Sequence, residues 1–293
     1  MISINTTQPL CTSCRKRVAV YRRLTSGEKL CRLCLFRSVA KQVRKTIHYY
    51  KMLKKKESVL YILRSDDVAL SIEAFAIIHA AVRDLEMSYN IICPSNIVNC
   101  NAVETHIKNL VKDAPINVVL THHSLDAIPK TFIHALKYVE ALAIKIALER
   151  NLSTILTPLF RDEMTLLSIY GLLTTSKTVF GEGLPIKRIG DVKVVRPFYH
   201  VISTDVMYLT ITSALRALEP LHEPCLKLTI GSDRFMEKAR KTLAKSPELM
   251  YSSAKSVELL QSFITAGSTL CKVCGSFSNR EVCEYCETIL KFL

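Results

Sequence analysis

Eight of the eleven cysteines in this sequence are paired in a way that suits metal binding. They form four Cys-x-x-Cys motifs, two near each end of the chain. Four thiolates from two such motifs surround a metal ion tetrahedrally, and the ion stabilises a segment too small to have a core of its own. The sequence therefore predicts two structural zinc ions, with an iron–sulfur centre or chance pairing as the alternatives at the first site. The predicted ligands are Cys11, Cys14, Cys31 and Cys34 in one ribbon and Cys271, Cys274, Cys283 and Cys286 in the other.

The positive charge of the chain is concentrated around the first cysteine motifs. The net charge is +14, and the first 56 residues hold 15 lysines and arginines against one acid, whereas the remaining residues hold 25 of each sign. A local basic block of this kind is typical of a surface that binds a polyanion. A surface that only aids solubility is the alternative.

Residues 36–56 predict one helix that carries much of this charge on a single face. Basic residues recur there at spacings of three and four, and apolar residues form the opposite stripe. We expect the basic face to bind a nucleic-acid backbone, with an acidic protein surface as the alternative. The residues predicted to bind are Arg37, Lys41, Arg44, Lys51 and Lys55.

A third candidate site lies where a predicted strand turns directly into a helix. The apolar run 59–63 is followed by Arg64-Ser65-Asp66-Asp67 and then by a helical pattern from residue 68. Such strand ends hold phosphate in many α/β proteins, usually through the backbone N–H groups of glycines. This turn has two acids and no glycine, which is unusual for a phosphate site.

The elements that position these residues alternate between strand and helix. Strands are predicted at 59–63, 89–93, 116–121, 153–159 and 192–199, and helices at 68–86, 102–112, 131–150 and 162–175. The alternation predicts an α/β fold with a Rossmann-like parallel sheet, in which ligands bind beyond the carboxyl ends of strands. The predicted division is a zinc ribbon at 1–35, a basic linker helix at 36–56, the α/β domain at 57–220, a helical segment at 221–266 and a zinc ribbon at 267–293.

Nothing in the sequence predicts a membrane span or a secretory signal. No run approaches the roughly 18 apolar residues of a span, and the first residues lack a basic-then-apolar signal pattern. We therefore expect a cytoplasmic protein with reduced cysteines and no membrane partner.

The order of the segments resembles that of the tRNA 2-thiolation enzymes, a family of the PP-loop ATP pyrophosphatase superfamily that makes 2-thiouridine in tRNA. The paired ribbons and the basic stretch "VRKTIHYYKMLKKKESVLYI" carry this resemblance. The stretch "VKVVRPFYHVISTDVMYLTI" is similar to the family's last core strand and following helix. The stretch "EPCLKLTIGSDRFMEKARKTLAKSPELMYSSAKSVELL" resembles the segment around its third active-site cysteine, which falls on Cys225. The resemblance implies an α/β domain of the adenine nucleotide alpha hydrolase type, tRNA as partner, and ATP-dependent sulfur transfer in active members.

Three active-site elements of the family are altered in this sequence. Its Ser-Gly-Gly-x-Asp-Ser loop corresponds to residues 64–69, which lack both glycines and bring carboxylates toward the polyphosphate. Its Cys-x-x-Cys before the helix at 131–150 is absent. Asp162 and Glu163 stand in place of a later Gly-His-Asn-x-Asp-Asp type motif, or simply begin a helix. These changes argue against bound ATP and an iron–sulfur cluster; a retained nucleotide site would use Ser65, Asp66 and Asp162.

The resemblance and these losses together predict a tRNA-binding, non-catalytic subunit of a tRNA uridine 2-thiolation system. Its partner would be an active PP-loop paralogue, or a second copy in a homodimer. One alternative is an active enzyme with divergent motifs, in which Cys225 would be catalytic. Another is a zinc-ribbon nucleic-acid adaptor on a retired nucleotide-binding fold. Cys93 and Cys100 are expected to be ordinary buried cysteines, unless folding brings them to the place of the missing pair.

Overall fold

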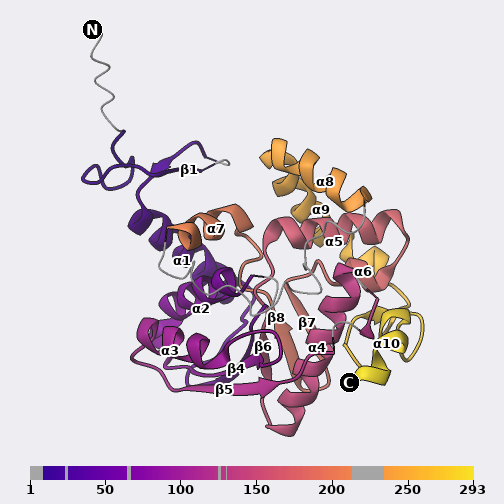
Figure 1. The fold of residues 1–293 in the computed structure, drawn as a ribbon. Coiled ribbons are helices and arrows are strands. Elements are labelled where there is room, and N and C mark those ends of the chain that lie inside the picture. Colours follow the sequence, from indigo (N-terminus) through magenta and orange to yellow (C-terminus); the bar gives the residue numbers. More distant parts are fainter. Residues whose placement is uncertain (1–8, 24–25, 65–66, 125–126, 130, 213–233) are drawn as a thin grey trace.

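A six-stranded sheet forms the centre of the protein (Figure 1). The computed structural model describes residues 9–23, 26–64, 67–124, 127–129, 131–212 and 234–293. The strands are β3 (Ser58–Ile62), β4 (Ser88–Pro94), β5 (Ile116–Thr121), β6 (Thr154–Leu156), β7 (Ile186–Ile189) and β8 (Val192–Val195), in the order β5-β4-β3-β6-β8-β7. All neighbouring strands are parallel except β7, which is antiparallel to β8. The predicted α/β fold class is confirmed.

The chain begins this sheet at an inner strand. β3 has β4 on one side and β6 on the other, so later strands are added outward in both directions. Val59, Leu60 and Tyr61 are fully buried, because a strand covered by helices on both faces has no solvent side. The carboxyl ends of β3 and β6 therefore form the switch point, where open α/β sheets bind their ligands.

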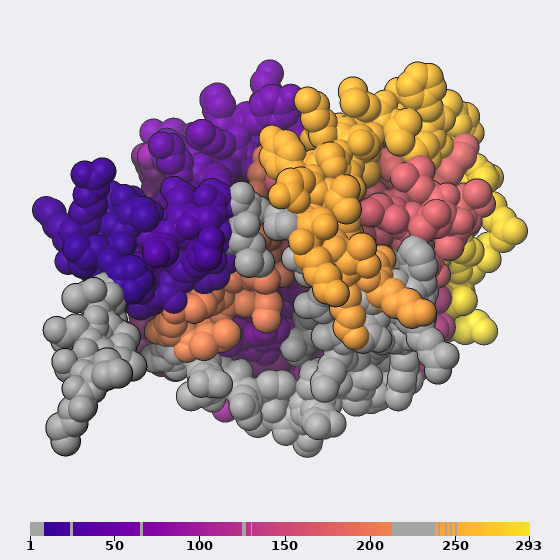
Figure 2. All heavy atoms as spheres, turned by 90° about the horizontal axis from the view of Figure 1, so that it is seen from above, coloured from indigo at the N-terminus to yellow at the C-terminus, as the bar shows by residue number. Residues whose placement is uncertain are grey.

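Helices cover both faces of the sheet. One layer consists of α1 (Arg32–Tyr49), α2 (Val68–Val82), α3 (Cys100–Leu110) and α7 (Ser203–Ile211). The other consists of α4 (Phe132–Glu149), α5 (Arg161–Leu173), α6 (Lys177–Gly181) and α10 (Glu284–Ile289). Two further helices, α8 (Arg234–Lys245) and α9 (Pro247–Ile264), pack on α5. Seen from above, α8 and α9 lie on one side of the protein and the N-terminal segment lies on the other (Figure 2).

The two cysteine-rich segments are small hairpins that pack on opposite layers. β1 (Tyr21–Arg22) pairs with β2 (Lys29–Leu30), and β9 (Thr269–Leu270) pairs with β10 (Phe277–Ser278). The first hairpin is tied to α7, because the Tyr21 hydroxyl and the Arg23 guanidinium both donate to the buried Asp205 carboxylate, at 2.7 and 3.0 Å. The second packs on α6 through β10, and α10, which follows it, packs on α4 in the other layer.

Most predicted elements agree with the structure, but the basic helix is shorter than 36–56. It begins directly after Cys31 and ends at Tyr49. There Lys51 adopts a positive φ of 51°, while the Lys51 and Met52 N–H groups donate back to the His48 and Ile47 carbonyls. This left-handed closure is the usual way to stop a helix. Lys51 and Lys55 therefore lie beyond the helix. The sequence analysis missed β7, whereas α7 is the helix that the resemblance implies after the last core strand. The domain boundaries stay a prediction.

Candidate functional site

The first four-cysteine group lies where β2 runs into the basic helix. The ligand atoms of Cys11, Cys14, Cys31 and Cys34 all lie within 4.8 Å of one another, and the Cys14 and Cys31 Sγ atoms are 3.9 Å apart. Cys31 is also the residue that caps α1, so one ligand is fixed by the start of the helix. Backbone hydrogen bonds from Lys16 and Arg17 lower the pKa of Cys14 to about 6, which favours the metal-binding thiolate.

The second four-cysteine group is fully buried against α4. The ligand atoms of Cys271, Cys274, Cys283 and Cys286 again lie within 4.8 Å of one another. The Cys274 and Cys283 Sγ atoms are 3.9 Å apart, and the Cys283 N–H donates to the Cys271 sulfur at 3.3 Å. Hydrogen bonds from the three neighbouring thiols, and beyond them the charge of Lys137, lower the pKa of Cys274. Both predicted ligand sets are thus brought together.

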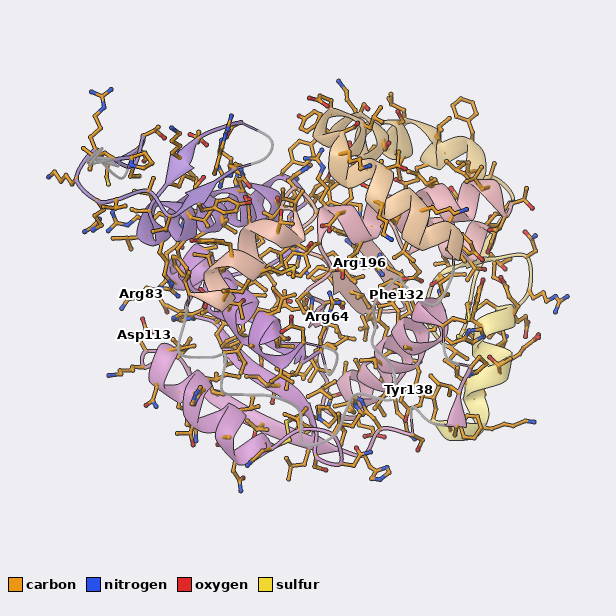
Figure 3. The ribbon with its side chains drawn as sticks, turned by 45° about the horizontal axis from the view of Figure 1, so that its top comes forward. Arg64, Arg83, Asp113, Phe132, Tyr138 and Arg196 are labelled. Carbon is orange, nitrogen blue, oxygen red and sulfur yellow. A yellow bond between two sulfur atoms is a disulfide. The ribbon has the colours of Figure 1, made fainter. Side chains whose placement is uncertain are left out.

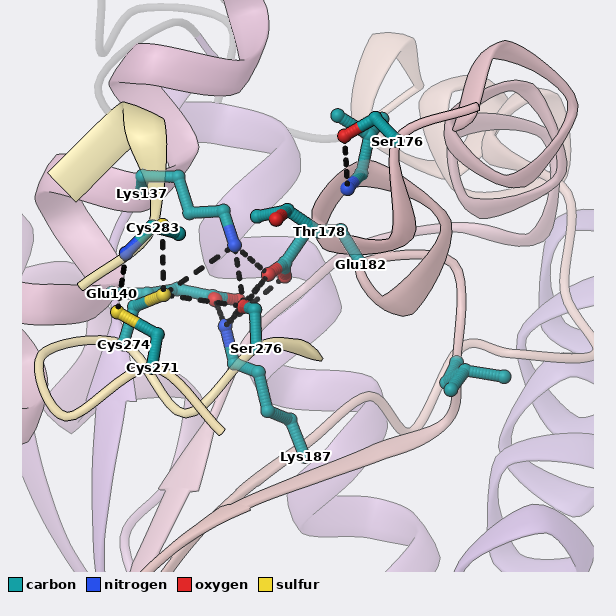
Figure 4. Close-up of polar contacts among 12 residues, drawn as sticks. Lys137, Glu140, Ser176, Thr178, Glu182, Lys187, Cys271, Cys274, Ser276 and Cys283 are labelled. Atoms are coloured by element: carbon teal, nitrogen blue, oxygen red, sulfur yellow. Dashed lines mark hydrogen bonds and ion pairs between the residues drawn. The ribbon is translucent and has the colours of Figure 1, made fainter. Parts of the chain in front are cut away.

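A buried network of charges surrounds this second group (Figure 4). The Lys137 ammonium donates to the Cys274 sulfur at 3.5 Å and also contacts Glu182 and Ser276. Burial opposes both charges, but Lys137 and Glu182 each stabilise the other's ion, so the pKa of Lys137 rises well above its usual value and that of Glu182 falls well below. The sequence analysis missed this network, because its members are far apart along the chain.

Three cations and two anions make up the charged part of the network. Lys187 contacts Glu140 and lies 3.1 Å from Glu182, and Arg196 lies 3.0 Å from Glu140 and also contacts Glu182. All five side chains are at most 4 % exposed. The network thus has one cation more than it has anions, and it lies next to four cysteines. Four thiolates carry four negative charges, of which a divalent ion or a [4Fe-4S]²⁺ core neutralises two. The network therefore offsets charge that a bound metal centre would leave in a buried place.

Among the described residues, Arg64 lies at the switch point between β3 and β6. Arg64, the first residue of the predicted phosphate turn, is 7 % exposed and points inward, where Figure 3 shows it in the middle of the molecule. Its Nη1 donates to Glu163 at 2.8 Å and to the Pro158 carbonyl at 3.2 Å. A cavity of about 20 Å³ remains between Arg64, Phe132 and Thr157. This cavity among the described residues has room for about one water molecule.

The helix N-termini around this point are also capped by acids of the chain itself. The Asp67 carboxylate accepts from the Leu70 N–H at 2.8 Å, so it takes a donor at the start of α2 that a phosphate would otherwise use. Asp162, a predicted nucleotide ligand, accepts from the Ser203 N–H and hydroxyl at 2.8 and 2.5 Å, which caps α7 instead. Ser65, Asp66 and Cys225 lie outside the described residues.

Cys93 and Cys100 differ from the sequence-based expectation. We expected ordinary buried cysteines in the reduced state, but the structure joins them by a disulfide between the end of β4 and the start of α3. Both are buried in the core of the α1–α2 layer. They lie together near the carboxyl edge of the sheet, and they are the only described cysteines outside the two four-cysteine groups.

The predicted tRNA-binding residues are exposed on α1 and just beyond its end, and two of the five form ion pairs. Arg44 donates to both Asp84 carboxylate oxygens, at 2.9 and 2.8 Å, and Lys55 lies 3.2 Å from Glu86. Within the described part of the chain, Arg37, Lys41 and Lys51 form no ion pair. These three cations are therefore the ones available to a polyanion.

This six-stranded sheet, with one four-cysteine group packed on each helical layer, is an arrangement with a counterpart among solved structures. The fold is similar to that of the U34-tRNA thiolase NcsA from Methanococcus maripaludis with its [4Fe-4S] cluster: the TM-score is 0.67, the identity is 17%, and the match covers 100% of this chain and 97% of that chain. No family model matches this sequence, and no curated protein matches it. The likeness confirms the predicted resemblance at the level of the fold.

The cofactor prediction needs correction. We expected two zinc ions and argued against an iron–sulfur cluster, but the solved structure that shares the fold carries a [4Fe-4S] cluster. Each of the two groups in this chain has four cysteines, the number of thiolates that such a cluster takes. Their Sγ spacing of 3.9 Å is that of ligands around one ion, so a four-iron cluster would require them to move apart.

In the described part of the chain, no helix is both long and apolar enough to span a membrane.

Proposed function

We propose that this protein is a tRNA-binding, non-catalytic subunit of a tRNA uridine thiolation system. It would act in the cytoplasm with an active PP-loop paralogue that supplies ATP and the sulfur chemistry. The fold shared with a tRNA thiolase supports the tRNA part of this proposal. The state of the nucleotide site supports the non-catalytic part.

One observation carries the non-catalytic proposal. In a working phosphate turn, backbone N–H groups and a helix N-terminus face the anion. Here the Arg64 side chain is bonded to Glu163, the Asp67 carboxylate caps α2, and the cavity that described residues form beside Arg64 measures about 20 Å³. A polyphosphate would have to displace these contacts and approach an anionic cap. An active enzyme with divergent motifs is therefore the less favoured alternative.

The tRNA-binding proposal is tested with the free cations of α1 and its end. Changing Arg37, Lys41 and Lys51 to Glu removes three exposed charges that make no ion pair with another described residue, so the fold should persist. We expect tRNA affinity to fall by about a hundredfold or more, because phosphate contacts dominate such affinities. The control changes the exposed residues Lys112, Lys255 and Lys291 to Glu, with the same charge change elsewhere. Equal affinities for the two triple variants would refute a role for α1.

An exposed apolar surface on α9 supports the partner proposal. Leu259 and Phe263, one turn apart, are 69% and 79% exposed, and Leu260 is 41% exposed. Changing Leu259 and Phe263 to Ser should abolish co-purification with an active PP-loop paralogue while leaving tRNA binding intact. Co-purification that survives this change would assign the partner to a different surface.

The corrected cofactor expectation is tested by chemical analysis. Protein reconstituted without oxygen should bind iron and acid-labile sulfide, if a four-cysteine group ligates an iron–sulfur cluster. Cys271→Ser and Cys11→Ser would then show which group is responsible. A protein that takes up neither iron nor sulfide would contradict the correction.

A further inference from the structure

A second cavity lies at the end of the basic helix and shares no lining residue with the cavity beside Arg64. It has a volume of about 320 Å³ and lies between the last turns of α1 and the short helix η1 (Arg83–Leu85). Figure 3 labels Arg83, the first residue of η1, at the edge of the molecule. The volume is at the lower end of the roughly 300–1,000 Å³ range of ligand pockets, so a single planar group such as a nucleic-acid base fits.

The floor of this cavity is apolar and its rim is basic. Ile47 of α1, Val82 at the end of α2 and Leu85 of η1 contribute apolar side chains. Arg44, His48 and Lys51 line it from the basic side of α1. This combination suits a ligand with a flat apolar part and an attached anion.

The one acid that lines the cavity is already neutralised. Asp84 accepts two hydrogen bonds from Arg44, and these bonds lower the pKa of its carboxyl. The carbonyls at the end of α1 are also satisfied, since Lys51 and Met52 donate to His48 and Ile47. Neither group is therefore left to repel an anion held by Lys51.

Lys51 has an unusual backbone for a lysine. Its φ is 51°, a conformation that glycine adopts more easily and that costs other residues roughly 1–2 kcal/mol. Glycine would close the helix equally well, so the lysine side chain is not explained by the local fold. Lys51 lines the cavity and makes no ion pair in the described part of the chain.

We propose that this cavity binds one unpaired nucleotide of an RNA whose backbone follows the basic face of α1. The base would lie on the Ile47, Val82 and Leu85 side chains, and the adjacent phosphate would lie against Lys51. Arg37 and Lys41, farther along the same helix, would hold neighbouring phosphates. The inference rests on the proposed RNA-binding function, and it adds that the recognised RNA must present an unpaired base.

Two variants test the cavity without charge reversal. Leu85→Trp fills it with no change in charge, and Lys51→Gly removes the cation from a backbone position that glycine prefers, so that fold should be kept. The matched controls are Leu110→Trp, at an exposed leucine of α3, and Lys56→Gly, at an exposed lysine whose φ is 58°. Thermal unfolding of all four variants checks that each is folded.

The readout is affinity for two RNAs with equal numbers of phosphates, a stem-loop with an unpaired loop and a blunt duplex. We expect Leu85→Trp to weaken stem-loop binding by about tenfold and to leave duplex binding unchanged, because only the base is excluded. Lys51→Gly should weaken stem-loop binding more than Lys56→Gly does.

Three results would overturn the proposal in distinguishable ways. If both cavity variants bind the stem-loop like the unchanged protein while the Arg37, Lys41 and Lys51 triple variant does not, RNA binding stands and the cavity is not the site. If the unchanged protein binds neither RNA, the proposed function fails as well. If a polyglutamate peptide binds instead and Leu85→Trp blocks it, the cavity is a protein-docking site.

Discussion

Arg64 and Glu163 form a buried ion pair across the switch point of the sheet, with 2.8 Å between Nη1 and Oε2. One residue follows β3 and the other lies in the first turn of α5, so the pair joins the two elements that border the expected nucleotide site. The Glu163 carboxylate also accepts from the Phe160 N–H at 3.0 Å, which fixes its position. Arg64, the first residue of the predicted phosphate turn, is thus part of the buried interior.

Removing one member of this pair should destabilise the protein strongly. In Glu163→Ala, Arg64 stays buried and loses the Glu163 counter-charge, and we expect a loss of about 3 kcal/mol in the free energy of unfolding. The control is Arg83→Ala, since Arg83 also forms an ion pair but its side chain is 73% exposed, so the loss should be below about 1 kcal/mol. Urea unfolding measures both. Equal losses would show that the Arg64 pair is no more structural than a surface pair.

The charge network predicts that Lys137 stabilises a metal centre bound by the second four-cysteine group. Lys137→Met removes the cation that lies 3.5 Å from the Cys274 sulfur, and the thiolates then keep more uncompensated charge. We expect metal release to a chelator to be faster by about tenfold or more. Lys145→Met is the matched control, because Lys145 lies on the same helix but is exposed. A release rate that is unchanged in Lys137→Met would mean that the hydrogen bond to sulfur contributes nothing.

A buried histidine predicts a loss of stability in mild acid. His123 is 3% exposed, neither ring nitrogen has a partner among the described residues, and burial, assisted by the charge of His122, lowers its pKa from 6.5 to about 4. The unfolded chain therefore binds a proton between these values that the folded chain does not, so stability falls as the pH drops through this window. The loss should reach about 2 kcal/mol at pH 5.

The variant His123→Phe isolates this effect, because phenylalanine cannot take up the proton. Its stability should change less between pH 7.5 and pH 5 than that of the unchanged protein, by about 2 kcal/mol in urea unfolding. His106→Gln, on α3, should keep the full pH dependence. If His123→Phe and the unchanged protein lose the same stability, the titrating group is a different one.

The sequence was sufficient for the parts of the fold that depend on local patterns. The strands at 59–63 and 116–121 and the helix at 131–150 were predicted to within two residues, because they combine periodic hydrophobicity with clear ends. The four-cysteine groups were found because their ligands are close in sequence. β7 was missed, since its two central residues, Lys187 and Arg188, are both charged and interrupt any strand-like apolar run.

Contacts between distant segments could not be predicted in the same way. The Arg64 pair spans 99 residues and the Lys137 contact to Cys274 spans 137, so no local pattern indicates them. The sequence indicated that the phosphate turn was altered, from its missing glycines. It did not indicate that Arg64 itself would fill the site.

The central claim is that this chain does not bind ATP at the carboxyl ends of its strands. Calorimetric titration of ATP with magnesium tests it most directly, on a sample whose folding is confirmed by tRNA binding. We predict no detectable binding up to about 1 mM ATP, which corresponds to a binding free energy weaker than about −4 kcal/mol. Binding with a dissociation constant of about 1 μM would contradict the account, because the Arg64–Glu163 pair would then open to admit a nucleotide.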